Sequence, residues 1–250
     1  MKKRRKKSKA ACPAVREVER VQSGIDGLDK LIEGGFVKDS TIMVRGGTGT
    51  GKTLFCLQYL YNGVAKYDEA GVYLSFSESE SIVCQHAARF GWDLKKLNNR
   101  DKFVVARYEP HEVANIMAQG GGTIRDIVEE LDAKRLVVDS LTAYEMVFES
   151  KYKANESILA FFDLLRKWDT TTLVTSEHPV TPYNESDGRL GFLTDGLLNL
   201  YHMRNNSCRT RALEVVKMRD TFHDENVNNF MITKKGLKIG RRLSHVGRKR

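Results

Sequence analysis

The sequence is poor in the features that mark secreted, membrane-spanning and metal-centred proteins. Its 250 residues include only four cysteines, which are scattered and form no C-x-x-C pair. Reduced, mostly buried thiols in an intracellular, cytoplasmic protein fit that usage better than a disulfide framework. No stretch reaches 18 apolar residues, so no transmembrane helix is expected, and the charged first nine residues lack the apolar run of a secretory signal. The six histidines show no metal-ligand spacing.

Acidic residues are missing from both ends of the chain, where basic residues crowd. Residues 1–9 hold seven of the 41 Lys and Arg residues and residues 241–250 hold five, so the net charge of +9 resides in the ends, and the rest carries 29 basic against 32 acidic residues. Such runs repel themselves, stay disordered and attract polyanions. They predict contact with nucleic acid, acidic protein or an anionic surface, or alternatively solvated tails that aid solubility. The chain then divides into a basic tail at 1–12, one domain at 13–240 and a second basic tail at 241–250.

One glycine-rich segment fits the phosphate-loop pattern G-x-x-x-x-G-K-[ST]. It consists of Gly46, Gly47, Thr48, Gly49, Thr50, Gly51, Lys52 and Thr53. The apolar run 40–44 before it predicts a short buried strand, and residues 54–60 after it predict a helix. Strand, glycine loop and helix are the context in which this pattern binds phosphate. A glycine-rich turn that binds nothing is the alternative, and the flanking elements argue against it.

Each residue type in this loop has a chemical reason to be there. Glycines let the backbone wrap a phosphate closely, and a helix N-terminus points unpaired N–H groups at the anion. Lys52 can reach the outer phosphates as a point charge, and the Thr53 hydroxyl can ligate Mg²⁺. The sequence therefore predicts binding of a nucleoside triphosphate.

Apolar runs and helical spacing alternate through the rest of the chain. Expected strands cover 71–76, 103–105, 136–139, 172–176, 197–203, 210–217 and 230–233, and expected helices cover 25–31, 80–90, 123–131 and 157–168. This order predicts an α/β fold in which helices flank a mostly parallel central sheet, followed by C-terminal antiparallel strands. Residues 120–122 predict a loop or hinge. Ligands of such sheets bind at the carboxyl ends of the strands, where the phosphate loop, Asp139 and residues 75–78 all fall.

Two acids follow these strands. Asp139 ends the apolar run 136–138, which is the form of a Walker B acid that holds Mg²⁺, although capping of the next helix is an alternative use. Glu78 follows the strand at 71–76 and can orient or deprotonate a water in line with the γ-phosphate. The alternative is that Glu78 and Glu80 only favour the start of the next helix through its dipole.

Another pair of residues could supply positive charge that stabilises the transition state of hydrolysis. Lys217 and Arg219 lie at the end of a late strand. In a monomer they would form an ordinary basic strand edge, whereas in a ring they can reach the nucleotide of the next copy and act in trans. Sequence spacing leaves both interpretations open.

With further segments, these residues resemble the single-domain, KaiC-type branch of the RecA-like P-loop ATPases. The resemblance runs from about Val21 to Ile239 and rests on 24–29, 34–35, the phosphate loop with 53–55, 59–63, 71–76, 138–142, 217–219 with Thr221 and His223, and 230–233. It implies a RecA-type fold, Mg²⁺ and ATP as ligands, a phosphate-binding segment that extends to Leu54, and a hexameric ring with ATP between copies. It also implies that Lys217 and Arg219 contact the phosphates of the adjacent copy's ATP, and that Met218, Thr221 and His223 line that shared site.

The sequence departs from the family pattern at two places. The family usually carries two glutamates after the second strand, whereas here Ser77 precedes Glu78. Because the first glutamate is the usual water activator, the resemblance implies hydrolysis that is slow or that depends on Glu78. Gly191 and Phe192 stand where the family's clock proteins have a phosphorylated Ser-Thr pair, so autokinase activity is not expected. The chain also has one ATPase domain where the clock proteins have two, so the resemblance does not imply a clock function.

Three functional hypotheses follow from these observations. The first is a slow Mg²⁺-dependent ATPase that acts as a nucleotide-driven regulatory ring. The second is a scaffold in which ATP joins the copies without being hydrolysed. The third is a DNA-linked paralogue of the RecA or RadA type, which the basic tails suggest. This hypothesis predicts polynucleotide binding that weakens steeply with salt.

Overall fold

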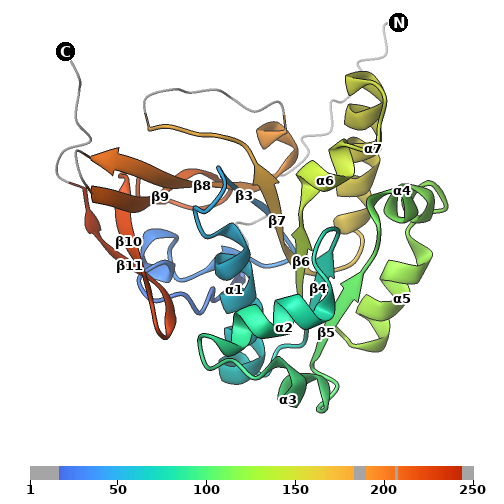
Figure 1. Cartoon of the computed structure of the whole chain (residues 1–250), viewed down its shortest axis with the longest axis horizontal. Helices are drawn as coiled ribbons and strands as arrows, with labels where there is room; N and C mark the ends of the chain where they lie inside the picture. The colour runs from blue at the N-terminus through green and yellow to red at the C-terminus, as the bar shows by residue number, and fades with distance from the viewer. Residues whose placement is uncertain (1–16, 183–189, 206–207, 244–250) are drawn as a thin grey trace, which may run out of the picture.

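The computed structural model describes residues 17–182, 190–205 and 208–243, and a nine-stranded sheet runs through its centre (Figure 1). The strand order across the sheet is β11-β10-β9-β8-β3-β7-β6-β4-β5. The strands are β3 (Thr41–Gly46), β4 (Gly71–Ser75), β5 (Phe103–Arg107), β6 (Arg135–Asp139), β7 (Thr171–Glu177), β8 (Gly196–Asn205), β9 (Cys208–Met218), β10 (Asn228–Thr233) and β11 (Gly236–Arg242). Strands β3 to β8 pair in parallel, whereas β8 to β11 pair antiparallel along the chain. The predicted sheet architecture is therefore confirmed.

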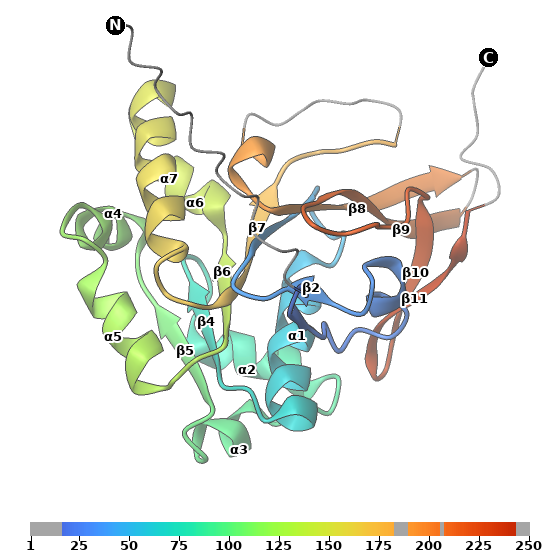
Figure 2. The same cartoon turned by 180° about the vertical axis from the view of Figure 1, so that it is seen from behind.

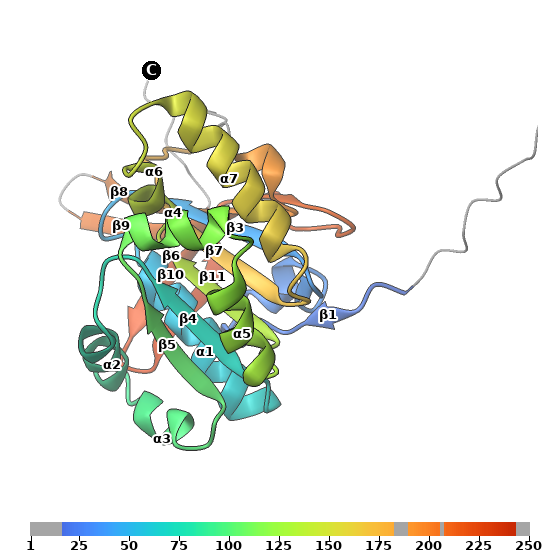
Figure 3. The same cartoon turned by 90° about the vertical axis from the view of Figure 1, so that its right-hand side faces the viewer.

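Helices cover both faces of the sheet (Figures 2 and 3). They are α1 (Lys52–Tyr67), α2 (Glu80–Ala88), α3 (Leu94–Asn98), α4 (Pro110–Ala118), α5 (Gly122–Glu130), α6 (Leu141–Glu145) and α7 (Lys151–Leu165). The helices expected at 54–60, 80–90, 123–131 and 157–168 all occur, with shifted ends. Helices α3, α4 and α6 were not expected, because each is short or lies beside turn residues. The predicted loop at 120–122 is confirmed for Gly120 and Gly121, and α5 begins at Gly122.

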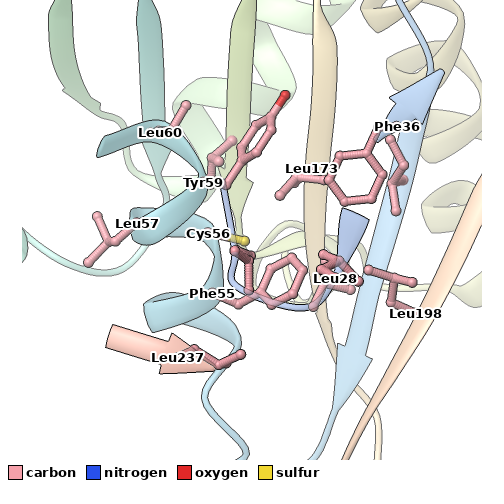
Figure 4. Close-up of a cluster of buried hydrophobic side chains, with 14 of the residues drawn as sticks. Leu28, Phe36, Phe55, Cys56, Leu57, Tyr59, Leu60, Leu173, Leu198 and Leu237 are labelled. Atoms are coloured by element: carbon pink, nitrogen blue, oxygen red, sulfur yellow. The ribbon is translucent and has the colours of Figure 1, made fainter. Parts of the chain in front are cut away.

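Alternating strand residues feed two separate cores. Ile42 and Val44 of β3 pack in a cluster around α1, whereas Met43 between them packs in a cluster with α4, α5 and α7. The same alternation separates Tyr73 from Leu74 in β4. Figure 4 shows the first cluster, with side chains of α1 pointing toward the sheet. A sheet buried on both faces is rigid, so it can hold the residues at its strand ends in fixed positions.

The helix predicted at 25–31 is wrong. The chain forms only a 3₁₀ turn, Asp29–Leu31, because Gly24 and Gly27 adopt the left-handed region with φ of 70° and 88°. The predicted apolar positions are nevertheless buried, since Ile25 and Leu28 are 2% and 0% exposed. A two-stranded ribbon of β1 (Arg20–Val21) and β2 (Phe36–Val37) flanks this turn.

Residues 241–242 and two of the described cysteines differ from their predicted description. Strand β11 continues to Arg242, two residues into the predicted C-terminal tail, while residues 1–12 with Cys12 and residues 244–250 lie outside the described part. Of the described thiols, Cys56 is buried, Cys84 is half-buried and Cys208 is exposed, so burial was correctly predicted only for Cys56. Within the described ranges, no helix has the length and apolar character to cross a membrane.

Candidate functional site

The phosphate loop connects the central strand β3 to helix α1. Gly49 and Gly51 have φ of 74° and 106°, a conformation that side-chain-bearing residues rarely adopt. A Cβ at Gly46 would lie 2.6 Å from the Leu200 carbonyl oxygen, so the backbone there tolerates no larger residue. The Thr50 hydroxyl donates to the Gly47 carbonyl at 2.8 Å and closes the turn. The predicted strand, glycine loop and helix are therefore present.

Lys52 is the first residue of α1 and lies over the loop. Its Nζ donates to the carbonyl oxygens of Gly46 and Gly47, at 2.8 and 3.0 Å. Partial burial lowers the pKa of Lys52, and the carboxylates of Glu177 and Asp139 oppose that shift. Unpaired N–H groups at the start of α1 face the same loop, and the first turn of α1 contains no acid. Positive potential is thus concentrated where the motif predicts phosphate.

Asp139 lies beside the loop and collects hydroxyl groups from three elements. Its carboxylate accepts hydrogen bonds from Thr53 at 2.9 Å, Tyr73 at 2.5 Å and Thr175 at 2.5 Å. Burial raises the pKa of Tyr73, so its hydroxyl remains a donor. Ser140, and not Asp139, caps α6 by accepting from the N–H of Ala143, which excludes the capping interpretation of Asp139.

The predicted metal ligands Thr53 and Asp139 thus lie side by side. Their oxygen atoms suit Mg²⁺, which proteins bind through one or two carboxylates together with phosphate oxygens and water. In the part of the chain that the structure describes, no group of three or more His, Cys, Asp or Glu residues could hold a metal by itself. This donor set fits a metal that is held jointly with a nucleotide.

Glu78 follows β4 and faces a cavity beside the loop. The Ser75 hydroxyl fixes its backbone by donating to the Glu78 carbonyl at 2.8 Å and accepting from its N–H at 3.0 Å. The Oε2 atom is buried, lies 3.4 Å from His86 Nδ1, and accepts no hydrogen bond within the described residues. Glu80, and not Glu78, is the acid in the first turn of α2, whereas Ser77 is exposed. The helix-dipole interpretation therefore applies to Glu80.

Residues of the phosphate loop and Glu78 line the same cavity. It has a volume of about 310 Å³ and is lined by Gly49, Gly51, Lys52, Thr53, Leu54, Leu57, Glu78, His86, Arg89 and Phe90. Its lining thus combines the phosphate loop and Lys52 with Glu78 after β4 and with Arg89 and Phe90, which directly follow α2. A phosphate chain and a larger attached group could lie along it.

Several site residues were not predicted from the sequence. Glu177 ends β7, and its carboxylate accepts a hydrogen bond from the Thr48 hydroxyl of the loop. Arg211 of β9 donates to the Gly49 carbonyl at 3.3 Å. Glu177 could have been found, because it directly follows the predicted strand 172–176 and strand ends carry the ligands in such sheets. The sequence around Arg211 shows no comparable feature that would have placed it at the site.

The predicted trans-acting residues lie at the other end of the sheet. Lys217 pairs with Leu197 near the start of β8 and donates to the carbonyl oxygens of Thr194 and Gly191, at 2.5 and 3.2 Å. Arg219 forms an ion pair with Asp195 at 2.9 Å. The structure therefore does not bring either cation to the phosphate loop of the same copy.

The three other residues of that segment have different environments. Met218 is buried at 6% exposure and packs in the α1 core. The Thr221 hydroxyl accepts from Arg20 at 2.9 Å and donates to the Arg219 carbonyl at 3.1 Å. His223 is half-buried, with Nδ1 3.2 Å from the Asp224 carbonyl. Their part in a shared nucleotide site stays a prediction.

Comparison with known proteins identifies the family. The model of the KaiC ATPase family matches residues 21–244. The chain belongs to the KaiC family of ATPases. It is 31% identical over 235 residues to the circadian clock oscillator protein KaiC of a Prochlorococcus marinus strain, a match that covers 89% of this chain and 46% of the relative. The circadian clock oscillator protein KaiC of a Nostoc species is 30% identical over 234 residues, with 89% and 44% covered.

A solved structure supports the same assignment for the whole fold. The crystal structure of a KaiC-like protein from the hyperthermophilic archaeon Pyrococcus horikoshii OT3 matches with a TM-score of 0.80 and 32% identity, over 90% of this chain and 100% of that one. This KaiC-family chain spans less than half the length of the curated relatives named above. Residues 21–244 thus form a KaiC-type ATPase domain with a RecA-like fold.

Proposed function

We propose that this chain hydrolyses ATP slowly with Mg²⁺, and that it does so as a hexameric regulatory ring with the nucleotide between copies. The observation that carries the ATPase assignment is the gathering of Lys52, Thr53 and Glu78 around one cavity of about 310 Å³, with Asp139 accepting a hydrogen bond from Thr53 at 2.9 Å. The choice of ATP and the number of copies rest on the family, whereas the catalytic assignment also rests on the chemistry of these four side chains.

Each side chain has a role in the proposed reaction. Thr53 and Asp139 would hold Mg²⁺, which neutralises charge on the phosphate oxygens when it is bound. Glu78 orients a water molecule and accepts its proton while the water oxygen bonds to the γ-phosphorus. The bond between that phosphorus and the bridging oxygen breaks, leaving ADP and inorganic phosphate. Lys52 stabilises the negative charge that develops on the phosphate oxygens.

The sheet register supports a site shared between copies. Leu197, the partner of Lys217, lies opposite Met43, whereas the phosphate loop begins at Gly46. Three residues of strand separate the two positions, which corresponds to about 10 Å. Lys217 and Arg219 therefore cannot reach the phosphates of their own copy without leaving the sheet, but the exposed end of Arg219 can meet those of a neighbour.

Two measurements on one sample test this proposal. Phosphate release and light-scattering mass are followed with Mg²⁺ and ATP, for the parent chain and for Lys52→Ala and Arg219→Ala. We expect ATP-dependent assembly and turnover in the parent, no turnover in Lys52→Ala, and assembly with much weaker turnover in Arg219→Ala. Parent protein that releases phosphate no faster than Lys52→Ala would refute the ATPase assignment.

A ring that ATP joins without turnover is the second candidate. Ser77 favours it, because its side chain is exposed and carries no carboxylate to activate water. Turnover above background that Glu78→Gln abolishes would exclude this candidate. Assembly with ATP that persists in the absence of any phosphate release would support it.

A further inference from the structure

A clamp fastens the segment after β9 to the N-terminal ribbon. Arg20 donates through Nη1 to the Thr221 hydroxyl at 2.9 Å and through Nη2 to the Asp220 carbonyl at 3.0 Å. The same guanidinium forms an ion pair with Glu33 at 2.8 Å. Glu33 in turn accepts from the backbone N–H of Phe222 at 3.1 Å. Residues 219–222 are therefore held by charge-assisted hydrogen bonds on two sides, and the Arg20 side chain is only 17% exposed.

The clamp presents one aromatic ring to solvent. Phe222 is 92% exposed, which is the highest value among the large hydrophobic side chains of the described residues. Thr221 beside it points its hydroxyl toward Arg20 and the chain's own backbone. A single exposed apolar residue is ordinary on a surface, but a fixed backbone that aims the ring outward removes the conformational freedom that binding would otherwise cost.

The proposed nucleotide site between copies predicts where the Phe222 ring would lie. The inference rests on the proposed function, in which Arg219 contacts phosphates bound by the next copy. Phe222 is three residues beyond Arg219 and thus lies within about 10 Å along the chain. A ring at this distance from Arg219 can reach the part of the neighbour's nucleotide that lies beyond the phosphates.

The receiving end of the cavity suits a flat base. Arg89 and Phe90, which directly follow α2, line the same cavity as Lys52 and Glu78. Phe90 is half-buried and packs against the α1 core, whereas Arg89 is exposed. A base that lay against Phe90 would have its other face open to solvent or to a neighbour. Aromatic rings stack on bases, and an arginine guanidinium packs on aromatic faces.

We propose that Phe222 of one copy covers the base of the nucleotide held by the next copy and packs against Arg89 there. The partner is a second copy of this chain, and the ligand group is the nucleobase. Arg20 is a positioning residue, because it acts by fixing the backbone that carries Phe222.

The test separates contacts to the base from contacts to the phosphates. Calorimetry measures binding of a non-hydrolysable imido analogue of ATP and of tripolyphosphate, each with Mg²⁺, by the parent, Phe222→Ala, Phe222→Trp and Tyr152→Ala. Tyr152 is the control, because it is also an exposed ring, at 77%, but lies on α7. We expect Phe222→Ala to weaken binding of the analogue about tenfold and to leave tripolyphosphate binding unchanged. Phe222→Trp should restore the affinity, and Tyr152→Ala should change neither.

Other outcomes distinguish a failure of this inference from a failure of the proposed function. If the parent assembles with ATP but Phe222→Ala binds both ligands as the parent does, this inference is wrong and the proposed function stands. Equal weakening of both ligands also overturns it, since the ring would then contact protein or phosphate and not the base. A parent that stays monomeric with ATP removes both proposals. A photoreactive p-benzoylphenylalanine at position 222 should cross-link to residues 86–90 of a second copy, and a cross-link confined to other segments would count against the inference.

Discussion

Arg135 is a fully buried cation at the start of β6, the strand that ends on Asp139. Its side chain is 0% exposed, and its Nε donates to Glu69 at 2.6 Å. The guanidinium also donates to the carbonyl oxygens of Tyr59, at 3.1 Å, and Gln22, at 2.9 Å, and lies 4.5 Å from the centre of the Tyr59 ring. One side chain therefore connects the sheet, helix α1 and the N-terminal segment.

Replacing Arg135 with Met keeps the stem of the side chain and removes all of these polar contacts. Removing one member of a buried ion pair costs about 3–5 kcal/mol. Glu69 keeps 30% of its side chain exposed and can rehydrate, so we expect a loss near the lower limit, about 3 kcal/mol. For a domain of this size, 1 kcal/mol shifts the melting temperature by about 2–4 °C, so Arg135→Met should melt about 6–12 °C lower.

Scanning calorimetry of the parent and two variants checks this expectation. Arg125→Met is the matched control, because Arg125 makes an ion pair with Glu129 at 2.7 Å on the surface of α5, where both side chains are more than half exposed. Such pairs contribute less than about 1 kcal/mol. Equal melting temperatures for Arg135→Met and Arg125→Met would refute the reasoning, because burial would then add nothing to the contribution of the cation.

Two other predictions concern the site and the thiols. Glu78→Gln should lower turnover about 100-fold or more while keeping nucleotide binding, because the amide cannot accept the proton of water. Glu177→Gln should lower turnover much less, since its amide oxygen can still accept a hydrogen bond from the Thr48 hydroxyl. Measured phosphate release that ranks the two variants in the opposite order would transfer the catalytic role to Glu177. Burial raises the pKa of the Cys56 thiol, so less of it is thiolate at any given pH, and iodoacetamide at pH 8 should modify exposed Cys208 well before Cys56. Mass spectrometry of the digested protein measures this order, and early modification of Cys56 would contradict its burial.

Local sequence patterns predicted the parts of the site that one segment builds alone. The phosphate loop needs only its glycines, Lys52 and the flanking strand and helix, all of which are adjacent in the chain. The same holds for Asp139, because an apolar run followed by an acid describes a buried strand with a half-buried end. These elements were predicted correctly, since their structure depends on neighbours in sequence.

Contacts between distant strands could not be predicted in the same way. Tyr73 reaches Asp139 because β4 lies beside β6 with Ser75 opposite Asp139, and Thr175 does so because β7 lies on the other side of β6. Strand order and register arise from packing of the whole sheet, which no single segment encodes. The helix prediction at 25–31 failed for a different reason, because glycines in the left-handed conformation override a helical spacing of apolar residues.

In the proposed assembly, the separation of the loop from Lys217 determines which surfaces of two copies would meet. A contact that joins the carboxyl end of the sheet in one copy to the amino end in the next uses two different surfaces, so it is heterologous. Such a contact closes into a ring when the rotation between copies divides a full turn, and otherwise it extends into a filament. Light scattering with Mg²⁺ and ATP distinguishes the two, because a closed ring keeps one mass as the protein concentration rises, whereas a filament grows. A mass that increases without limit would refute the ring and leave the shared site intact.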